Sequence, residues 1–525
     1  MMRKKNWSSD PVCSLQSCSF FFFFFFFMAF CVCSTIPVAA EYRTVNIGVV
    51  LDLETLLGRK SLSILSMALD DFYSSHAGYQ TRIAFHVRDS KQDVVGAASA
   101  ALDLIKNSQV EAIIGPPTSM QTHFILSLCN KAQVPIISFS ASSPLLSPTR
   151  NPYFFRATQN DSAQVAALSS LVKHFSWREA VPVFAQDGYG EGIVPFLTDA
   201  LQKVDCRVHY RAALAPEATD SEVSEELNRL MSMETRVFIV HMLPDLGIRV
   251  FKKAMEIGMM EAGFVWIVSD GMANMLKNNM NSTVLESMNG VLGIRNHIPK
   301  SKQLEEFTIR WKRKFQSENA DVLDAKLDIF GIWAHDAALA LAMAVEKVFG
   351  NRTQASQFQS NTVTVNATDL ATDLGLLMSN AGPQLREALL SLSFEGLAGN
   401  FHFLNGEIQP HAYQIVNVNE NGGRGIGYWT ALGGISRVLN LNKSGTGSYP
   451  ELGQVIWPGE NKEVPKGWTV PGKIYQTNPL PNLNHPNTPI QTQITNLPHF
   501  LIIPVFQKPK PRIPVFPQPE LFENG

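Results

Sequence analysis

Short apolar runs alternate with helical patterns along most of this chain from Val45 onward. Most positions of these runs are apolar, without the strict alternation of a half-exposed strand, which predicts strands buried on both faces. The runs cover residues 45–51, 83–87, 112–115, 134–139, 154–155, 180–184, 237–240, 264–268 and 290–294. Apolar residues spaced by three or four positions predict helices over 61–73, 94–105, 120–131, 162–174, 192–204 and 246–257. The alternation predicts an α/β protein whose parallel sheets are covered by helices.

The alternation pauses after residue 139 and resumes near residue 154, which predicts two doubly wound lobes in series. Two long helical patterns follow over residues 303–316 and 330–348. A further helix (384–392) and three strands (400–403, 412–418 and 428–432) complete the pattern. We expect a type I periplasmic-binding-protein-like bilobed clamshell, two parallel-sheet lobes joined by a hinge. The strand-rich residues 383–440 are expected to be a closing element or the hinge itself.

Length and charge narrow the class of protein. The chain has 525 residues, enough for two or three domains. Its formal net charge is −2, and Lys and Arg form no long run. A nucleic-acid surface needs clustered cations, so we expect no nucleic-acid partner.

The first 40 residues have the features of a secretory signal. Basic residues at 3–5 precede a phenylalanine run at 20–27, and Val38–Ala39–Ala40 fits a cleavage site. The alternative is an uncleaved membrane anchor, although the apolar core is shorter than the ~20 residues that a span needs. Either way, the chain is expected in the secretory pathway, secreted or on the outer face of the plasma membrane. Five sequons then predict glycosylation, at Asn160, Asn281, Asn351, Asn366 and Asn442.

Only Cys129 and Cys206 remain after the leader. Two buried thiols are the favoured interpretation, and a disulfide between them stays the alternative. No Cys/His cluster has the spacing of a metal site. We expect no metal and no cofactor.

Four loops fall at the carboxyl ends of predicted strands, where open α/β sheets bind ligands. They are Ser138–Ser143, Asp161–Ser162, Gly188–Gly192 and Ser269–Gly271. Each has a structural explanation: a serine-rich turn, a helix N-cap, a tight glycine turn and a strand end. Together they line one edge of the predicted lobes, where Asp270 is a candidate partner for a ligand ammonium. The glycine loop lacks the third glycine of a dinucleotide fingerprint.

Catalytic motifs are missing from the sequence: it has no G-x-S-x-G elbow, no P-loop and no H-E-x-x-H. His335–Asp336 is expected to be local structure, and Asp70–Asp71 a solvated helix face. We therefore expect no catalytic residues, and an enzyme is the least favoured class.

Several segments resemble the amino-terminal domain of plant glutamate receptor-like channels, within the type I periplasmic-binding-protein (receptor ligand-binding region) family. The resemblance covers residues 43–471. It is carried by residues 88–93 (RDSKQD) with 97–105, by 112–116 (AIIGP), by 133–141 (QVPIISFSA), by Tyr189–Gly190 with 197–201, and by the exit from Trp457–Pro458–Gly459 to Pro471.

The resemblance implies an amino-acid-like ligand in the interlobe cleft. Ser140, Ala141, Ser142 and Ser162 would hold its α-carboxylate, and Tyr189 with Asp270 its α-ammonium. Arg59 and Lys60 would face a side-chain acid. Other glutamate receptor-like subunits are the implied partners, in homo- or hetero-oligomers. The alternative is a subunit-assembly or decoy module that pairs with full-length receptors and binds no ligand.

The composition changes after Pro471. The 54 residues that follow contain 11 prolines and two glycines, the composition of a disordered tail. In the family this position leads toward an agonist domain and a pore, so we expect a chain truncated before both. The expected organisation is a leader at 1–40, a bilobed receptor region at 41–471 and a proline-rich tail at 472–525.

Overall fold

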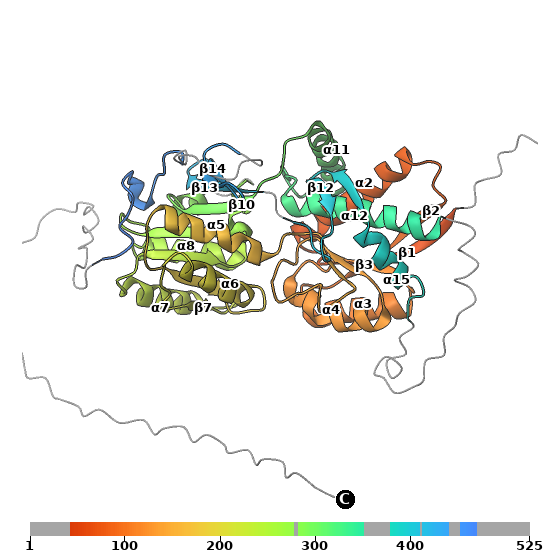
Figure 1. Ribbon diagram of the computed structural model, residues 1–525, viewed down its shortest axis with the longest axis horizontal. Helices are drawn as coiled ribbons and strands as arrows, with labels where there is room; N and C mark the ends of the chain where they lie inside the picture. The colour runs from red at the N-terminus through yellow and green to blue at the C-terminus, as the bar shows by residue number, and fades with distance from the viewer. Residues whose placement is uncertain (1–41, 278–281, 351–377, 410–411, 440–451, 470–525) are drawn as a thin grey trace, which may run out of the picture. The chain divides into compact units, whose positions relative to one another are not determined.

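The computed structural model describes residues 42–277, 282–350, 378–409, 412–439 and 452–469. Two α/β lobes make up this part of the chain, each built around its own sheet (Figure 1). The predicted α/β class is confirmed. The expected leader and the proline-rich tail lie outside the described residues.

The first lobe contains a five-stranded parallel sheet in the order β2-β1-β3-β4-β5. Its strands are β1 (Arg43–Leu51), β2 (Thr81–Asp89), β3 (Ala112–Ile114), β4 (Ile136–Ser138) and β5 (Phe154–Arg156). Successive residues of β1 enter opposite cores: Val49 packs in one cluster and Val50 in the other. Both faces of the sheet are therefore buried, which explains the continuous apolar runs.

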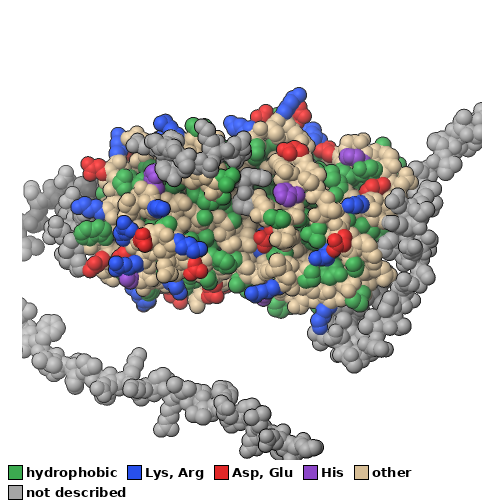
Figure 2. Space-filling model, viewed as in Figure 1, with side chains coloured by type: hydrophobic (Ala, Val, Ile, Leu, Met, Phe, Trp, Pro, Cys, Tyr) green, Lys and Arg blue, Asp and Glu red, His purple; other side chains and the backbone are tan. Residues whose placement is uncertain are grey.

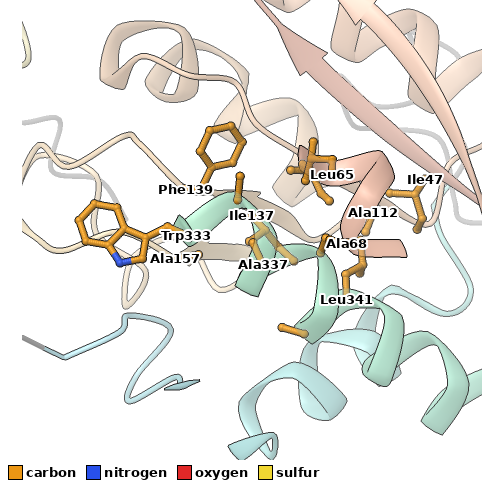
Figure 3. Packing of buried hydrophobic residues seen from close by; sticks show 14 of the residues in the cluster. Ile47, Leu65, Ala68, Ala112, Ile137, Phe139, Ala157, Trp333, Ala337 and Leu341 are labelled. Atoms are coloured by element: carbon orange, nitrogen blue, oxygen red, sulfur yellow. The ribbon is translucent and has the colours of Figure 1, made fainter. Parts of the chain in front are cut away.

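Helices cover both faces of the first sheet. Helices α3 (Val94–Lys106) and α4 (Ser119–Ala132) bury one face. Helices α2 (Leu56–Ser75) and α12 (Ile329–Phe349) bury the other, with α11 (Lys302–Glu318), α15 (Gly382–Leu390) and the hairpin β11 (Ser393–Gly396)–β12 (Gly399–His402). Figure 3 shows Ala337 and Leu341 of α12 beside Ala68 of α2 and the sheet residues Ile47 and Ala112. Most of these helices begin at a Thr, Ser or Asp whose side chain accepts a backbone N–H, the usual N-cap.

Helix α12 is long and apolar enough to cross a membrane by length and composition, but most of it is buried inside the lobe. Its Asp336, fully buried, accepts hydrogen bonds from the backbone N–H groups of Leu397 (2.8 Å) and Ala398 (2.9 Å) at the β11–β12 turn. His335 Nδ1 lies 2.9 Å from the same carboxylate. The pair fixes a turn against a helix, as expected for local structure.

The second lobe contains an eight-stranded sheet in the order β15-β14-β13-β10-β9-β8-β6-β7. The first part is parallel: β6 (Val181–Ala185), β7 (Ala212–Leu214), β8 (Val237–His241), β9 (Val265–Val268) and β10 (Leu292–Asn296). The last three strands join antiparallel: β13 (Tyr413–Asn419), β14 (Gly422–Thr430) and β15 (Gly434–Ser436). The sheet is therefore mixed, not purely parallel.

Helices also cover both faces of the second sheet. Helices α5 (Asp161–His174) and α6 (Gly190–Gln202) pack on one face. Helices α7 (Asp220–Met231), α8 (Pro244–Glu256) and α10 (Ser282–Ser287) pack on the other. The short α9 (Asp270–Ala273) and the 3-10 turn η1 (Met275–Lys277) follow β9.

The lobes are not consecutive in sequence, contrary to the expected arrangement in series. The chain leaves the first lobe after β5, returns to it after β10, and leaves again after β12. Helices α11 and α12, expected in the second half, complete the first core through Trp311 and Trp333. The segment 383–440 is shared by the two lobes: its first part packs in the first core, its strands β13–β15 extend the second sheet, and the chain crosses between the lobes from β12 to β13.

The last described segment, residues 452–469, packs on the second lobe. It includes the 3-10 turn η2 (Pro458–Glu460). Trp457 is 1% exposed and lies against Phe175 and Trp177, and the Trp177 indole donates to the Pro465 carbonyl (2.8 Å). Residues up to Thr469, whose N–H donates to Glu234 O, therefore belong to the folded part.

Candidate functional site

The serine loop after β4 joins the two lobes. Ser142 Oγ donates to Asp161 Oδ2 (2.8 Å) and Ser143 Oγ to the carbonyl of Gly188 (2.6 Å). Gly192 is needed at this contact, because a Cβ there would lie 2.4 Å from Ser143 Oγ. The loop is fixed from behind by the buried Arg156, whose Nη1 donates to the carbonyls of Ala141 (3.1 Å) and Ser143 (3.0 Å). Ser140 Oγ donates to Pro117 O (2.7 Å), within the first lobe.

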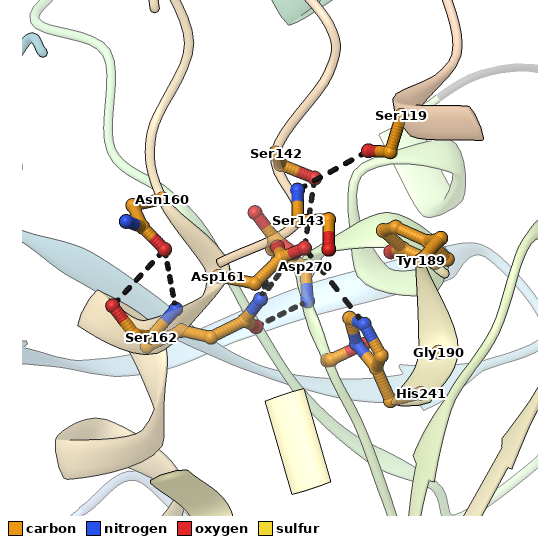
Figure 4. A network of polar contacts seen from close by, with 12 residues as sticks. Ser119, Ser142, Ser143, Asn160, Asp161, Ser162, Tyr189, Gly190, His241 and Asp270 are labelled. Atoms are coloured by element: carbon orange, nitrogen blue, oxygen red, sulfur yellow. Dashed lines mark hydrogen bonds and ion pairs between the residues drawn. The ribbon is translucent and has the colours of Figure 1, made fainter. Parts of the chain in front are cut away.

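Two buried carboxylates lie at this junction (Figure 4). Asp161 is the first residue of α5 and Asp270 the first of α9. Gln164 connects them: its Nε2 donates to Asp161 Oδ1 (2.9 Å) and to Asp270 Oδ1 (2.7 Å), and its Oε1 accepts from the Asp270 N–H (2.9 Å). The two acids are 1% and 9% exposed. They are thus held together by one amide nitrogen in a site that excludes most water.

Asn296, at the end of β10, provides the other side-chain donor to Asp270. Its Nδ2 lies 2.9 Å from Asp270 Oδ2. Its Oδ1 is buried and has no hydrogen-bond partner. An unpaired buried acceptor of this kind is rare and needs a functional or structural explanation.

An aromatic pair lies next to the acids. Tyr189 is 7% exposed, and its ring centroid is 4.4 Å from that of His241 at the end of β8. His241 Nδ1 is 2.8 Å from Ser269 Oγ, while Nε2 has no hydrogen-bond partner and lies 3.8 Å from Asp161 Oδ2. Gly271 makes room for the tyrosine, because a Cβ there would be 2.4 Å from Tyr189 Oη. The tyrosine is therefore packed at the lobe junction and does not project freely from its glycine loop.

Burial dominates the electrostatics of this cluster. It raises the pKa of Asp161 well above its ordinary value, and the neighbouring Asp270 charge raises it further. Burial also raises the pKa of Asp270, against the hydrogen bonds from Gln164 and Asn296. The pKa of His241 falls to about 3 because its ring is fully buried, so the ring is neutral and makes no ion pair with Asp161. The cluster is an acidic, poorly solvated site beside a tyrosine ring.

The structure brings together Ser142, Tyr189 and Asp270 among the residues predicted to bind a ligand. Ser162 lies beside them in sequence, but its N–H and Oγ are both 3.0 Å from Asn160 Oδ1. Asn160 is thus the N-cap of α5, where the sequence suggested Asp161 or Ser162. Ser140 and Ala141 lie in the loop behind Ser142.

Arg59 and Lys60 lie outside the acidic cluster, on α2. Arg59 pairs with Asp321 (2.8 Å) and the buried Lys60 with Asp328. Asp328 helps to line a cavity of about 40 Å³. The other lining residues are Asn274, Asn296, Ile298, Leu327, Ile329 and Ile332. Asn296 thus lies between the acidic cluster and a cavity whose aliphatic walls, Ile298, Leu327, Ile329 and Ile332, all pack with the first core.

Sequence reasoning missed Gln164, His241 and Asn296, and it placed Asp161 in a candidate ligand loop without assigning its side chain a ligand contact. Each lies one to three residues from a predicted strand or helix end. Their shared position at the carboxyl edge of the second sheet is visible only once β10 is placed beside β9.

Cys129 and Cys206 are both buried free thiols, as favoured from the sequence. Of the sequons, Asn281, Asn351, Asn366 and Asn442 lie outside the described residues. Asn160 is half-buried, and its Nδ2 is 3.3 Å from both carboxylate oxygens of Glu407. A glycan on Asn160 would have to replace these contacts.

Charge on the surface is mixed. Figure 2 shows Lys, Arg, Asp and Glu side chains dispersed over the visible face, without a large area of one sign. Among the described residues, no group of three His, Cys, Asp or Glu side chains is placed to hold a metal ion.

The comparisons with known proteins agree on one family. Residues 63–421 match the family described as "Receptor family ligand binding region". The chain is 46% identical over 456 residues to Glutamate receptor 2.2 of Arabidopsis thaliana, covering 86% of this chain and 48% of that protein. It is 47% identical over 430 residues to Glutamate receptor 2.7 of the same plant, covering 81% of this chain and 44% of that protein. The chain thus spans about half the length of the curated relatives it matches.

Proposed function

This chain belongs to the family of receptor ligand binding regions, and we propose that it binds an amino-acid-like ligand in the cleft between its lobes. It is a glutamate receptor-like amino-terminal ligand-binding domain, and the prediction that it is not an enzyme is confirmed by the family. We further propose that this domain serves as the extracellular sensor of a ligand-gated cation channel.

One observation carries the ligand proposal: the buried acid pair lies where the first lobe touches the second. Ser142 of the first lobe donates to Asp161 of the second, so any group bound to the acids contacts both lobes. A ligand held there stabilises the contact between lobes, which is how a sensor of this kind converts binding into a change of conformation. Tyr189 and Asp270 are the proposed partners of the ligand ammonium.

Titration of the full chain with each of the twenty amino acids, followed by calorimetry, tests this proposal. We expect at least one to bind, with an affinity that falls in Asp270→Asn. Asp71→Asn is the matched control, because Asp71 lies in an exposed ion pair with Arg310. If no amino acid binds, the amino-acid proposal is wrong.

Subunit assembly is the second candidate, favoured by exposed apolar side chains on the first lobe. Val95 of α3 is 63% exposed and Phe124 of α4 is 53% exposed, on helices that pack together. Large apolar side chains in solvent are typical of interaction surfaces when they gather. We propose pairing with other glutamate receptor-like subunits through this face. Light scattering of the chain and of Phe124→Glu tests it, and an unchanged monomer in both would contradict it.

The proposed location is the secretory pathway and the extracellular face of the plasma membrane. The signal-like residues 1–40 and the sequons support it. The proposed boundaries remain 41–471 for the receptor region and 472–525 for the tail. N-terminal sequencing and glycosidase treatment of the secreted chain test the leader and the glycans.

A further inference from the structure

We propose that Met120 is a site of reversible oxidation by peroxide, and that its oxidation loosens the contact between the two lobes. Met120 is the second residue of α4, in the first lobe, and its sulfur contacts Gly188 of the second lobe. The proposal goes beyond the proposed function, because this contact exists whether or not the cleft takes a ligand.

Two side chains of the first lobe hold one residue of the second. The Gly188 N–H donates to Met120 Sδ (3.3 Å), and the Gly188 carbonyl accepts from Ser143 Oγ (2.6 Å). The next residue is Tyr189, whose ring packs against His241 (Figure 4). Both polar groups of the Gly188 backbone are thus used between the lobes. Loss of either bond would loosen the loop that positions Tyr189.

The glycine at position 188 is explained by the sulfur atom. A Cβ there would lie 2.6 Å from Met120 Sδ. The φ angle of Gly188 lies outside the left-handed region, so the backbone conformation does not require a glycine. Gly192 makes room for Ser143 Oγ in the same way. The loop therefore accommodates two side chains from the other lobe, and the sulfur contact is a built feature of the junction.

The thioether of Met120 belongs to a side chain that solvent reaches. Met120 is 41% exposed, whereas Met242 and Met272, which adjoin His241 and Gly271 in sequence, are 0% exposed. Methionine in solvent is open to oxidation, and the susceptibility of sulfur follows its exposure. Among these methionines at the junction, Met120 is therefore the one that a dissolved peroxide would oxidise.

Oxidation changes what the sulfur atom can accept. Hydrogen peroxide transfers one oxygen to the thioether: an S–O bond forms, the O–O bond breaks, the sulfur loses two electrons and the peroxide leaves as water. An oxygen between Sδ and Gly188 N would lie far inside the ~2.9 Å of a normal N–H···O bond, since sulfur and nitrogen are only 3.3 Å apart. An oxygen turned outward would draw the polar side chain toward water. Either arrangement displaces Sδ from the Gly188 N–H.

Hydrogen–deuterium exchange of the full chain before and after treatment with hydrogen peroxide tests this inference. Peptide masses report oxidation of Met120. We expect amide exchange over residues 186–192 to become about two- to tenfold faster, the range that follows from the loss of one hydrogen bond. Methionine sulfoxide reductase should restore the original rate, because sulfoxide formation is reversible.

Two variants assign the effect to one sulfur atom. Met120→Leu lacks the acceptor, so residues 186–192 should exchange fast before treatment, and peroxide should change the rate no further. Met255→Leu is the matched control, because Met255 of α8 is also 41% exposed but lies near the C-terminal end of its helix in the second lobe. Peroxide should act on this variant as on the unchanged chain.

Three results would overturn the inference. Exchange over residues 186–192 that stays constant while Met120 is oxidised would show that the sulfur does not hold the loop. Oxidation of Met255 with Met120 left intact would show that peroxide does not reach the thioether. Faster exchange after peroxide in Met120→Leu would assign the effect to another residue. None of these measurements involves a ligand, so their failure and the failure of the amino-acid titration are distinguishable.

Discussion

Lowering the pH from 7.5 to 5 should destabilise the second lobe through His241. The native ring is fully buried and its pKa is about 3, whereas an unfolded histidine has its ordinary pKa of 6.5. Below pH 6.5 the unfolded chain therefore gains a proton that the native ring does not. Stability falls as the pH drops from 6.5 toward 3, and is unaffected by this group above about pH 7.5. From these two pKa values the loss at pH 5 is about 2 kcal/mol.

Other groups change protonation as the pH falls, so the contribution of His241 to the free energy of unfolding must be isolated from theirs. Asp161 and Asp270 have raised native pKa values, and their protonation stabilises the fold as the pH falls, which is the opposite sign. His241→Phe keeps a ring against Tyr189 and removes the titration. Urea unfolding of both proteins at pH 7.5 and pH 5, followed by tryptophan fluorescence, gives the difference. Equal losses of stability in the two proteins would refute the account of His241 as a buried neutral ring.

Three further predictions concern other buried groups. Asp336→Ala should lower the free energy of unfolding by about 2–6 kcal/mol, because the N–H groups of Leu397 and Ala398 lose their acceptor. Chemical denaturation measures this loss, and the control Asp71→Ala should cost less than about 1 kcal/mol. A cost as small as that for Asp336→Ala would contradict the prediction. Asp161→Asn should raise the melting temperature at pH 7.5, since burial and the neighbouring Asp270 both disfavour the charged form of this acid; a lower melting temperature would show that the charge stabilises the fold. Burial raises the thiol pKa of Cys129 and Cys206 to about 12, so neither thiol should react with a maleimide at pH 7 until urea unfolds the chain. Mass spectrometry of the labelled peptides measures the reaction, and rapid labelling of the native protein would argue against burial of the thiols.

The strands and helices of the repeating α/β pattern were predictable because both sheet faces are buried. That burial makes strands such as β6 and β8 apolar at nearly every position. The short β7, β11 and β15 were missed, because exposed or half-exposed positions interrupt their apolar pattern. The equally short β3 and β4 are fully buried and were predicted. The amphipathic helix α7 was also missed. Its Thr219–Glu222 capping box is a local signal that was available.

Lobe membership could not be read from the sequence. The apolar pattern of α12 says that the helix is buried but not which sheet buries it. The same limit applies to β13, whose alternation fits either sheet edge. These assignments depend on contacts between residues far apart in sequence, such as Ile415 with Ile294.

The site was predictable in outline only. The rule that ligands bind at the carboxyl ends of strands found Ser142, Tyr189 and Asp270. It did not find Gln164, because a glutamine on a helix carries no local signal of its role. The hydrogen bonds that join the two acids through Gln164 appear only when the side chains are placed together.

The interrupted order of the lobes has a consequence for synthesis on the ribosome. The first core needs Phe401 and Phe403, and the second needs Val416 and Val418, which follow almost directly. Neither core is complete before these residues have emerged from the ribosome, although the synthesis of each lobe began long before. Both lobes therefore wait, exposed to chaperones and proteases, and the second core is completed only when Trp457 has emerged, after the first. A nascent chain released before Phe403 would leave two unfinished cores instead of one finished lobe.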